Sequence, residues 1–563
     1  MKAIACFLLV AFALCAQKPA RESQPQQPPA TPPETKPEDL SAIEGQVLSL
    51  ATGAPVPKAD VILRGTRRTV SGPAMQLSYS TVSDAGGNFA MQDVEPGEYR
   101  LSIRRTGFVN FDYGARSPAH AGTLLSLDPG RRLKELVARL TPHGVITGRV
   151  LDGNGEPIVS GQVEAMRYSY QSGRKQLIPA GSASTNDLGE YRIYGLAPGR
   201  YCLDARPGDE SYHNAPDRSA VPLVENDVRT YYPGTIDPAA AVPLEVGPGM
   251  QMRGVNLSLV KARTFRVRGR VEGRTGVNVT LLPRGQARWS YPNSEFMTGP
   301  KGSFEIDRIL PGAYSLSATA WDGQKIYSAR QDIDIGETNI DDLVLTLAPS
   351  VEISGRFEIE GASPPKLDSL KVYLRPREEF GIVYPSVEVR SDDGTFTISN
   401  AILEAYSLQV TGSPDGYWVK SIRMGGQEVK YRGIDLAHTP AAPLSITLAP
   451  NAAQIDGVVL NERQQPAPGA MVVLVPEQKL REQTEAYKTA SSDQNGRFTL
   501  KNIDPGDYTL LAWEDVEYRA YMDPNFLKPV EDRGQAISLQ EGGHQSVHLN
   551  LIPADAAAKS QRD

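Results

Sequence analysis

Metal ligation is the first chemistry to consider for the six histidines of this chain. Zinc sites on helices use spacings such as His-Glu-x-x-His, which bring both imidazoles to one face. No histidine here begins such a spacing. His544 and His548 are four residues apart, but they flank and enter a predicted strand, where that spacing does not converge. The chain also lacks a Gly-x-Ser-x-Gly elbow, a phosphate-binding loop and a dinucleotide fingerprint. We therefore expect a protein that is not an enzyme and that uses no metal or cofactor.

Three short acidic segments superficially resemble calcium loops: Asp152–Glu156, Asp392–Gly394 and Asp493–Gly496. They lack the terminal carboxylate spacing of a full EF-hand. Asx turns, in which a side-chain oxygen accepts from the backbone two residues on, are the favoured interpretation. Weak calcium binding is the alternative.

Aromatic residues crowd the segment that follows the predicted strand at Tyr508. Sandwich domains hold sugars on exposed rings, because the ring face meets the C–H face of a pyranose, and loops on a rigid scaffold can carry such a function. The candidate ligand-binding residues are Trp513, Tyr518, Tyr521 and Phe526. Core packing is the alternative, and it is the commoner role for a tryptophan near a strand.

A sequence motif that occurs five times, called here the repeated phrase, predicts the strands that would hold such a site in place. An Asx- and Gly-containing turn leads to an aromatic residue, and a tyrosine follows ten residues later, usually after Pro-Gly. The fixed offset is expected if both rings face one core, because a slip of one residue would turn them to opposite faces. Pro-Gly predicts a type II turn, although Leu403-Glu404 stands there in the fourth copy. The ring pairs are Phe89 and Tyr99, Tyr191 and Tyr201, Phe304 and Tyr314, Phe396 and Tyr406, and Phe498 and Tyr508.

Each copy also has an opening and a closing strand signature. The openings alternate apolar and polar residues around a glycine, as in Ile43–Val47, which predicts a bulge or a close backbone approach. The closings alternate in the same way, as in Leu136–Leu140. About one hundred residues of short strands and turns lie between them, the pattern of an antiparallel sandwich. We expect an all-β chain of five tandem antiparallel Ig-like or transthyretin-like β-sandwich domains.

The expected organisation follows from these signatures and from the two ends of the chain. The predicted segments are a signal peptide at 1–16, a Pro-rich linker at 17–40, β-sandwiches at 41–142, 143–262, 263–349, 350–450 and 451–556, and a polar tail at 557–563.

The N-terminus predicts export. Lys2 precedes an uncharged run to Ala16 that is too short to cross a bilayer as a helix, and no second apolar span follows. A lipid anchor at Cys15 is the alternative, disfavoured because Leu14 is larger than such a site prefers. Only Cys202 then remains in the mature chain, so no intrachain disulfide is possible, and a buried strand position is expected for it. The net charge of −7 argues against nucleic-acid binding.

The opening Ile-x-Gly-x-Val, the Asp-x-x-Gly-x-Phe turn and the Pro-Gly-x-Tyr-x-Leu strand together resemble the carboxypeptidase regulatory-like family. The resemblance covers roughly Ser41 to Pro553 and implies transthyretin-like (prealbumin-like) sandwiches, related in shape to carbohydrate-binding folds. It implies no catalytic motif. Three further segments resemble multi-repeat secreted proteins of acidobacteria: Tyr231–Thr235, Val419–Arg423 and Ala512–Glu517.

Two functional hypotheses follow. In the first, the chain is a non-catalytic scaffold or adhesion protein, secreted or held in the periplasm or cell envelope, with envelope proteins as partners. In the second, one or more modules bind a surface polysaccharide through exposed aromatic residues. Exposure of the tryptophans separates the two, because a sugar platform needs exposed rings. Fold resemblance alone does not decide the function.

Overall fold

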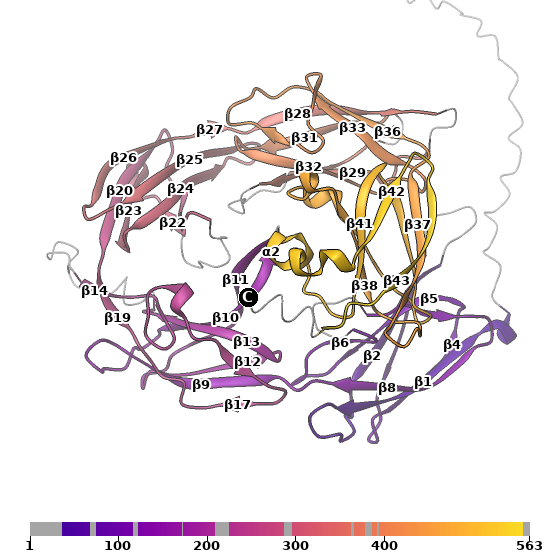
Figure 1. The fold of residues 1–563 in the computed structure, drawn as a ribbon. Helices are drawn as coiled ribbons and strands as arrows, with labels where there is room; N and C mark the ends of the chain where they lie inside the picture. The colour runs from indigo at the N-terminus through magenta and orange to yellow at the C-terminus, as the bar shows by residue number, and fades with distance from the viewer. Residues whose placement is uncertain are drawn as a thin grey trace, which may run out of the picture.

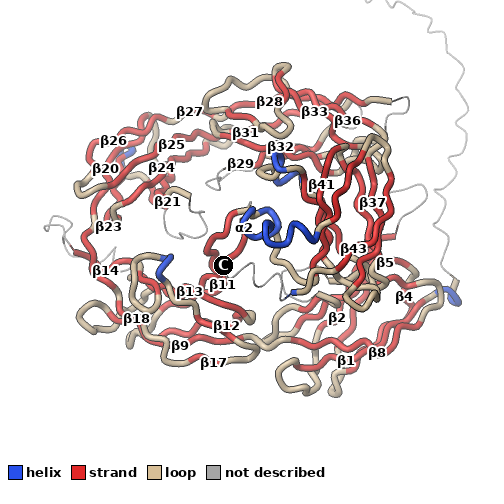
Figure 2. Tube along the Cα trace, viewed as in Figure 1, coloured by secondary structure: helices blue, strands red, loops and turns tan. Residues whose placement is uncertain are grey.

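The computed structural model describes residues 36–67, 75–115, 122–171, 173–208, 225–285, 295–361, 365–377, 385–390 and 393–554. The signal peptide expected at 1–16, most of the linker at 17–40 and the tail at 557–563 lie outside these residues. Strands dominate the described chain, and its few helices are short (Figure 2). The all-β fold expected from the sequence is confirmed. None of the described helices combines the length and the apolar character that crossing a bilayer would require.

The strands form five pairs of sheets, and each pair encloses one hydrophobic cluster. We call each pair a module. In the first module, after the short helix η1 (Pro37–Asp39), one sheet has the order β4-β1-β8 and the other β3-β2-β5-β6, with β7 beside β5. Its strands are β1 Ser41–Ser49, β2 Asp60–Arg67, β3 Met75–Val82, β4 Asn88–Val94, β5 Gly97–Arg104, β6 Phe111–Asp112, β7 Leu125–Leu127 and β8 Arg132–Leu140.

The second module repeats this plan and adds a separate pair of strands, β14 and β19. Its sheets have the orders β12-β9-β17, with β18 beside β9, and β11-β10-β13-β15, with β16 beside β13. The elements are β9 Gly144–Leu151, β10 Gln162–Gln171, β11 Arg174–Ser184, β12 Glu190–Leu196, β13 Gly199–Arg206, β14 Glu225–Val228, β15 Thr230–Tyr231, η2 Pro238–Ala240, β16 Leu244–Val246, β17 Gln251–Met252, β18 Leu257–Ser258 and β19 Val260–Arg263.

The third and fourth modules differ from the first two mainly in the strands at the edges of their sheets. The third has sheets β23-β20-β26 and β22-β21-β24-β25-β27, and the fourth has β31-β28-β36-β33-β34 and β30-β29-β32-β35. The third contains β20 Phe265–Glu272, β21 Asn278–Pro283, β22 Glu295–Met297, η4 Pro300–Gly302, β23 Ser303–Ile309, β24 Gly312–Trp321, β25 Ile326–Ile335, β26 Ile340–Thr346 and β27 Ala348–Pro349. The fourth contains β28 Val351–Ile359, β29 Lys371–Pro376, β30 Ser386–Glu388, β31 Thr395–Ala401, β32 Ala405–Thr411, β33 Trp418–Met424, β34 Gln427–Glu428, β35 Ile434–Asp435 and β36 Leu444–Ala449.

The fifth module carries the helical segments at the centre of the molecule (Figure 2). Its sheets are β40-β37-β43 and β39-β38-β41-β42. The elements are β37 Ala453–Leu460, β38 Met471–Pro476, η5 Gln478–Leu480, η6 Thr484–Ala486, β39 Lys488–Ser491, β40 Arg497–Ile503, β41 Gly506–Trp513, η7 Ala520–Met522, α2 Pro524–Leu527, η8 Lys528–Arg533, β42 Gln535–Leu539 and β43 His544–Asn550. We call residues 514–534, between β41 and β42, the central insert.

The opening and closing strands pair directly, and they pair in parallel. In the fifth module Gly457 of β37 lies opposite Val547 of β43, and the equivalent strands of the other four modules are parallel as well. The remaining contacts between neighbouring strands are antiparallel, with the exception of β9 and β17. Each sandwich is therefore mixed and not purely antiparallel, because its closing strand runs parallel to its opening strand.

The glycine of each opening strand lies under the aromatic ring of the repeated phrase. A Cβ at Gly457 would lie 2.5 Å from Cζ of Phe498, so a close approach of backbone and ring requires glycine there. The close approach expected from the sequence is present in all five modules. The paired residues are Gly45 and Phe89, Gly148 and Tyr191, Gly269 and Phe304, Gly355 and Phe396, and Gly457 and Phe498.

The tyrosine of the phrase has a constant partner. In each module its ring packs at the core and its Oη donates to the carbonyl oxygen four residues earlier. This contact holds the turn before the strand, including the turn of the fourth module that lacks Pro-Gly. The pairs are Tyr99 to Glu95 at 2.7 Å, Tyr201 to Ala197 at 2.6 Å, Tyr314 to Leu310 at 2.9 Å, Tyr406 to Ile402 at 3.2 Å and Tyr508 to Asp504 at 2.9 Å.

The expected type II turn at Pro-Gly is wrong. Gly506 has φ of 156°, whereas the third residue of a type II turn needs φ near about +80°. The left-handed residue lies instead at the bulge that ends the preceding strand, six residues before the tyrosine. These residues are Asp93, Gly195, Arg308, Asn400 and Asn502. The bulge redirects the chain, so the left-handed residue lies in the bulge and not in the Pro-Gly turn.

The five modules close into a ring (Figure 1). The sheet with the opening and closing strands faces outward in each module, and the other sheet faces the middle. The fifth module returns to the first, where Gln494 Nε2 donates to the carbonyl oxygen of Ser126 at 3.4 Å and Gly469 lies against Thr123. The central insert reaches the second module, with η7 against β11. The first and last modules are thus neighbours in space.

Candidate functional site

The four aromatic residues singled out from the sequence do not form one exposed platform. Trp513 is 0% exposed, and Tyr521 and Phe526 are each 1% exposed. The Trp513 ring lies 6.5 Å from that of Tyr521 and 6.4 Å from that of Phe526, between centroids. Tyr518 alone is at the surface, 51% exposed. The expectation of exposed rings is therefore wrong at three of the four positions.

The alternation of β41 explains why Trp513 is buried. Tyr508, Leu510 and Ala512 face the core between the two sheets of the fifth module. Leu511 and Trp513 face the other side, which the central insert covers. The rings therefore belong to a second hydrophobic cluster on the inward face of the module.

This second cluster also joins the fifth module to the second. Tyr170 of β10 belongs to it and meets Phe526 edge to face, with 6.2 Å between ring centroids. Burial at this contact, followed by the charges of Asp523 and Glu517, raises the pKa of Tyr170 to about 12. The phenol therefore stays neutral at physiological pH and packs as an apolar ring.

A cavity of about 490 Å³ lies between the fourth and fifth modules. We call it the junction cavity. Its walls come from β32 and β33 of the fourth module and from β39 and the end of β40 in the fifth. The central insert contributes Tyr518, Arg519, Tyr521 and Met522. Tyr518 and Tyr521 both line it, so two of the four aromatic candidates meet there. Trp513 and Phe526 do not line it.

Lys430 and Asp504 form a paired charge at the wall of the junction cavity. Lys430 Nζ lies 2.6 Å from Oδ2 of Asp504, and Oη of Tyr431 donates to the same oxygen at 2.5 Å. The ammonium also lies 5.2 Å from the ring centroid of Trp418. Burial, followed by the charge of Asp504, raises the pKa of Tyr431 far above its usual range. These contacts attach the fourth module to the fifth, because Asp504 belongs to the fifth and the others to the fourth.

Lys488 differs from Lys430 in having no such partner. It stands at the start of β39 and lines the junction cavity. Burial is the main cause of its lowered pKa, and the attraction of Asp504 and repulsion by Lys430 are smaller. Its ammonium forms no hydrogen bond or ion pair within the described residues. The cavity thus holds a partly buried cation that has no ion-pair partner among the described side chains.

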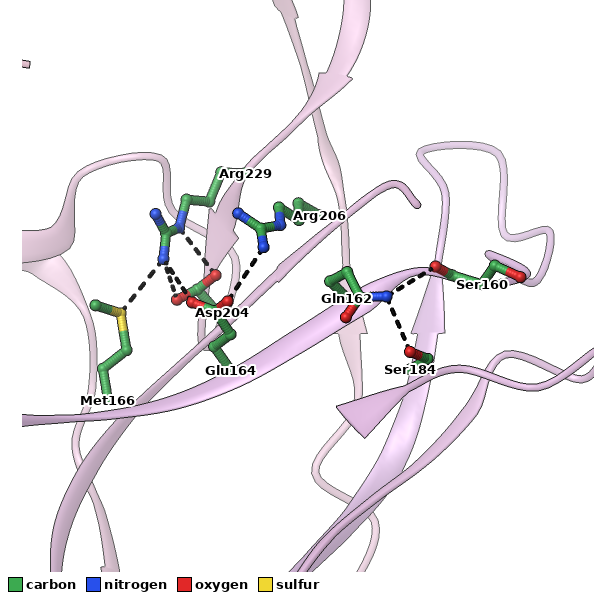
Figure 3. A network of polar contacts seen from close by, with 8 residues as sticks. All are labelled: Ser160, Gln162, Glu164, Met166, Ser184, Asp204, Arg206 and Arg229. Atoms are coloured by element: carbon green, nitrogen blue, oxygen red, sulfur yellow. Dashed lines mark hydrogen bonds and ion pairs between the residues drawn. The ribbon is translucent and has the colours of Figure 1, made fainter. Parts of the chain in front are cut away.

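A second buried polar cluster, in the second module, is by contrast saturated (Figure 3). Arg229 holds Asp204 with two contacts of 2.9 Å and lies 3.2 Å from Glu164, and Arg206 lies 3.1 Å from Glu164. Desolvation, followed by repulsion from Asp204, raises the pKa of Glu164 even so. The two carboxylates and two guanidinium groups of this cluster balance in charge. Because Glu164 lies on β10 and Asp204 on β13, the contacts of Arg229 attach its segment to both strands.

The remaining reactive side chains have ordinary environments. Cys202 is buried in β13, as expected, and burial raises the pKa of its thiol. Asp493 accepts from the backbone N–H groups of Asn495 and Arg497, which is the Asx-turn interpretation of that acidic segment. Across the described ranges, no group of three or more His, Cys, Asp and Glu side chains is placed to hold a metal ion.

Sequence reasoning missed Lys430, Lys488 and Asp504. No motif marks them, and they come from two different copies of the repeat. The available signal is the comparison between copies: Asp504 occupies the place of the carbonyl acceptor before the tyrosine, where other copies have Glu95, Ala197, Leu310 and Ile402. Their meeting depends on how modules pack, which a single copy does not encode.

Residues 42–127 match the family model of the carboxypeptidase regulatory-like domain. The resemblance expected from the sequence is confirmed for this segment, which lies within the first module. No curated protein is significantly similar to the chain.

Solved structures show only distant likeness. The minor pilin GBS52 of Streptococcus agalactiae is 12% identical, with 39% of this chain and 96% of that chain covered and a TM-score of 0.23. The TIE protein of Bacillus anthracis is 11% identical, with 72% and 73% covered and a TM-score of 0.15. The major pilin subunit of Bacillus cereus is 10% identical, with 73% and 99% covered and a TM-score of 0.13. Scores at this level carry no argument about function.

Proposed function

We propose that this protein is a non-catalytic scaffold that is exported to the cell envelope or the extracellular space and binds other proteins there. The closure of the ring supports this most, since the fifth module contacts the first through Gln494 and the second through Phe526. Closure fixes the distances between the loops of different modules. Fixed loop positions on a rigid framework suit a protein that holds partners in place.

The modules are proposed to be folding domains with the boundaries expected from the sequence, at 142, 262, 349, 450 and 556. Each would then own one hydrophobic cluster and could lose its fold separately. The proposal includes cleavage of the signal peptide after Ala16. N-terminal sequencing of the exported protein should give Gln17, whereas a blocked N-terminus with the mass of a lipid would assign the anchor to Cys15.

Carbohydrate binding is the second candidate function, and the junction cavity favours it. Tyr518 combines a half-exposed ring with a place on the cavity wall. Cavities of a few hundred Å³ lined by aromatic residues and a few polar groups are typical ligand sites. The aromatic argument therefore moves from Trp513, which is buried, to Tyr518.

One binding experiment separates the two functions. The labelled chain from residue 17 to 563 is incubated with envelope fragments that are untreated, protease-treated or oxidised with periodate, which cleaves sugar diols. The scaffold proposal expects protease to abolish retention and periodate to spare it. The reverse pattern, together with loss of retention in Tyr518→Ala, establishes the carbohydrate alternative. Equal retention on all three preparations overturns both.

A further inference from the structure

The junction cavity is rich in positive charge, although the chain as a whole carries a net charge of −7. The basic residues that line it are Arg375, Lys430, Lys488, Lys501 and Arg519. The acidic residues that line it are Glu485 and Asp504. An excess of cations in a recessed site with low-dielectric walls attracts an anion.

The cations differ in whether they are already neutralised. Lys430 pairs with Asp504 at 2.6 Å, and Lys501 lies 3.5 Å from Asp415. Lys488 has no side-chain hydrogen bond or ion pair, and Nε of Arg519 is buried with no hydrogen-bond partner, as far as the described chain extends. A buried donor without a partner costs free energy, so a ligand that accepts from Nε of Arg519 would recover it. The same ligand would neutralise the partly buried ammonium of Lys488 if it carried a negative charge.

The same cavity offers an aromatic surface next to these cations. The ring of Tyr518 is half exposed, and the guanidinium of Arg519 lies 5.1 Å from its centroid. Trp418 and Tyr521 are buried parts of the wall. A ring that faces the cavity can stack on the C–H face of a pyranose, while a cation beside it donates to a carboxylate carried by the same sugar.

We propose that the junction cavity binds an acidic saccharide, with its carboxylate at Lys488 and Arg519 and its pyranose ring against Tyr518. This inference rests on the carbohydrate alternative and goes further by naming the charge of the ligand. Charge-assisted hydrogen bonds supply specificity for the acid, and the tyrosine ring supplies specificity for the sugar. A neutral sugar would leave both cations without a charged acceptor.

Calorimetric titration of the full mature chain tests the inference with three probes: trigalacturonic acid, a neutral galactose trisaccharide and inorganic phosphate. Trigalacturonic acid should bind at least about tenfold more tightly than the neutral sugar, because a hydrogen bond between charged groups is stronger than one between neutral groups. Lys488→Gln should remove this preference, and Lys488→Arg should restore part of it. Tyr518→Ala should weaken the acidic and the neutral trisaccharide alike. Lys134→Gln, on β8 of the first module, should change nothing.

Three results would overturn the inference. Equal affinity for both trisaccharides, unaffected by Lys488→Gln, would remove the acidic part and leave carbohydrate binding in place. If phosphate binding depends on Lys488 and is as tight as the binding of trigalacturonic acid, the cavity is an anion site only. No binding of any probe, while periodate treatment still abolishes envelope retention, would place the saccharide site elsewhere on the ring. Thermal melts of each variant identify any substitution that unfolds the junction.

Discussion

Single residues repeat the same contacts in all five modules, and Phe498 shows their energetic weight. Its ring is buried in the core of the fifth module and covers Gly457. The neighbouring Arg497 points to the opposite, exposed face of β40. Position along the strand therefore decides which of these two adjacent side chains the fold depends on.

Phe498→Ala should lower the free energy of unfolding of the fifth module by about 3–5 kcal/mol, the range for truncating a buried phenylalanine. Arg497→Ala should stay within about 0.5 kcal/mol of the parent. Urea unfolding followed by tryptophan fluorescence can compare them, since Trp513 is buried in the same module. Equal shifts in the two variants would show that the strand register is wrong.

The lowered pKa of Lys488 predicts that the free energy of unfolding changes with pH in the alkaline range. Its pKa is lowered in the folded chain, so between that value and the ordinary lysine pKa of about 10.4 the unfolded chain binds more protons. Stability should therefore rise with pH through this window on account of Lys488, and its destabilising effect is fully present below the window. Lys488→Gln should be more stable than the parent at about pH 7, and the difference should shrink as pH approaches about 10.

Urea midpoints of parent and variant at about pH 7, 8.5 and 10 provide the measurement. Buried tyrosines such as Tyr431 and Tyr487 have raised pKa values and destabilise the fold above about pH 10 in both proteins, which is why only the difference is informative. A constant difference at all three pH values would mean that Lys488 does not titrate differently on folding.

Among the elements, the opening strand is the one most constrained by a neighbour. In the third module a Cβ at Gly269 would clash with the carbonyl oxygen of Leu343 and lie 2.7 Å from Cζ of Phe304, whereas nothing lies within 4 Å of a Cβ at Gly336. Neither glycine has a positive φ, so the same substitution tests contact alone.

Gly269→Ala should destabilise the third module by about 1–3 kcal/mol through overpacking. Gly336→Ala should be neutral or stabilising by about 0.4–1 kcal/mol, because alanine restricts the unfolded chain. Scanning calorimetry of the two variants gives the comparison. Indistinguishable thermograms would mean that the Phe304 ring and the backbone at Leu343 can both move aside at no cost.

Much of the structure of each module could be predicted from the repeated phrase. The contacts between modules could be predicted much less well. Alternation predicted that Phe498 and Tyr508 face one core, and the glycine of the opening strand predicted a close approach. Alternation carries no strand direction, so the parallel pairing of opening and closing strands was not foreseen. In the structure Trp513 lies on the opposite face of β41 from Tyr508, because the two residues are an odd number of positions apart. No local pattern says that the central insert covers that face.

The whole molecule depends on contacts between residues far apart in the chain. Gln494 and Ser126 are 368 residues apart, and Phe526 meets Tyr170 across the ring. Such contacts have no sequence signature, because each partner satisfies the pattern of its own module. Ring closure and the junction cavity were therefore beyond prediction from one sequence.

Tyr170→Ala should loosen the ring, since it removes the edge-to-face contact with Phe526 and leaves a gap in the second cluster. Small-angle X-ray scattering should then show a larger maximum dimension than the parent. Tyr194→Ala is the matched control, because Tyr194 is 74% exposed on β12 of the same module. Identical scattering of all three proteins would place the closure energy in the contact between the fifth and first modules.

The fifth module should fold alone when residues 451–556 are expressed, because its core cluster contains no residue from another module. A cooperative melt of a soluble product is the expected result. A molten product that becomes cooperative on adding the second module would instead assign its stability to the contact at Tyr170.

Ring closure also changes how the molecule would bear a pull. In an open row of modules, tension applied between two points passes through every joint between them, so the weakest joint sets the limit. In a closed ring the load divides between two arcs, and rupture of one joint still leaves an intact path through the other. Loss of one contact between modules, such as that of Gln494 with Ser126, would thus leave the two loaded points joined through the other arc.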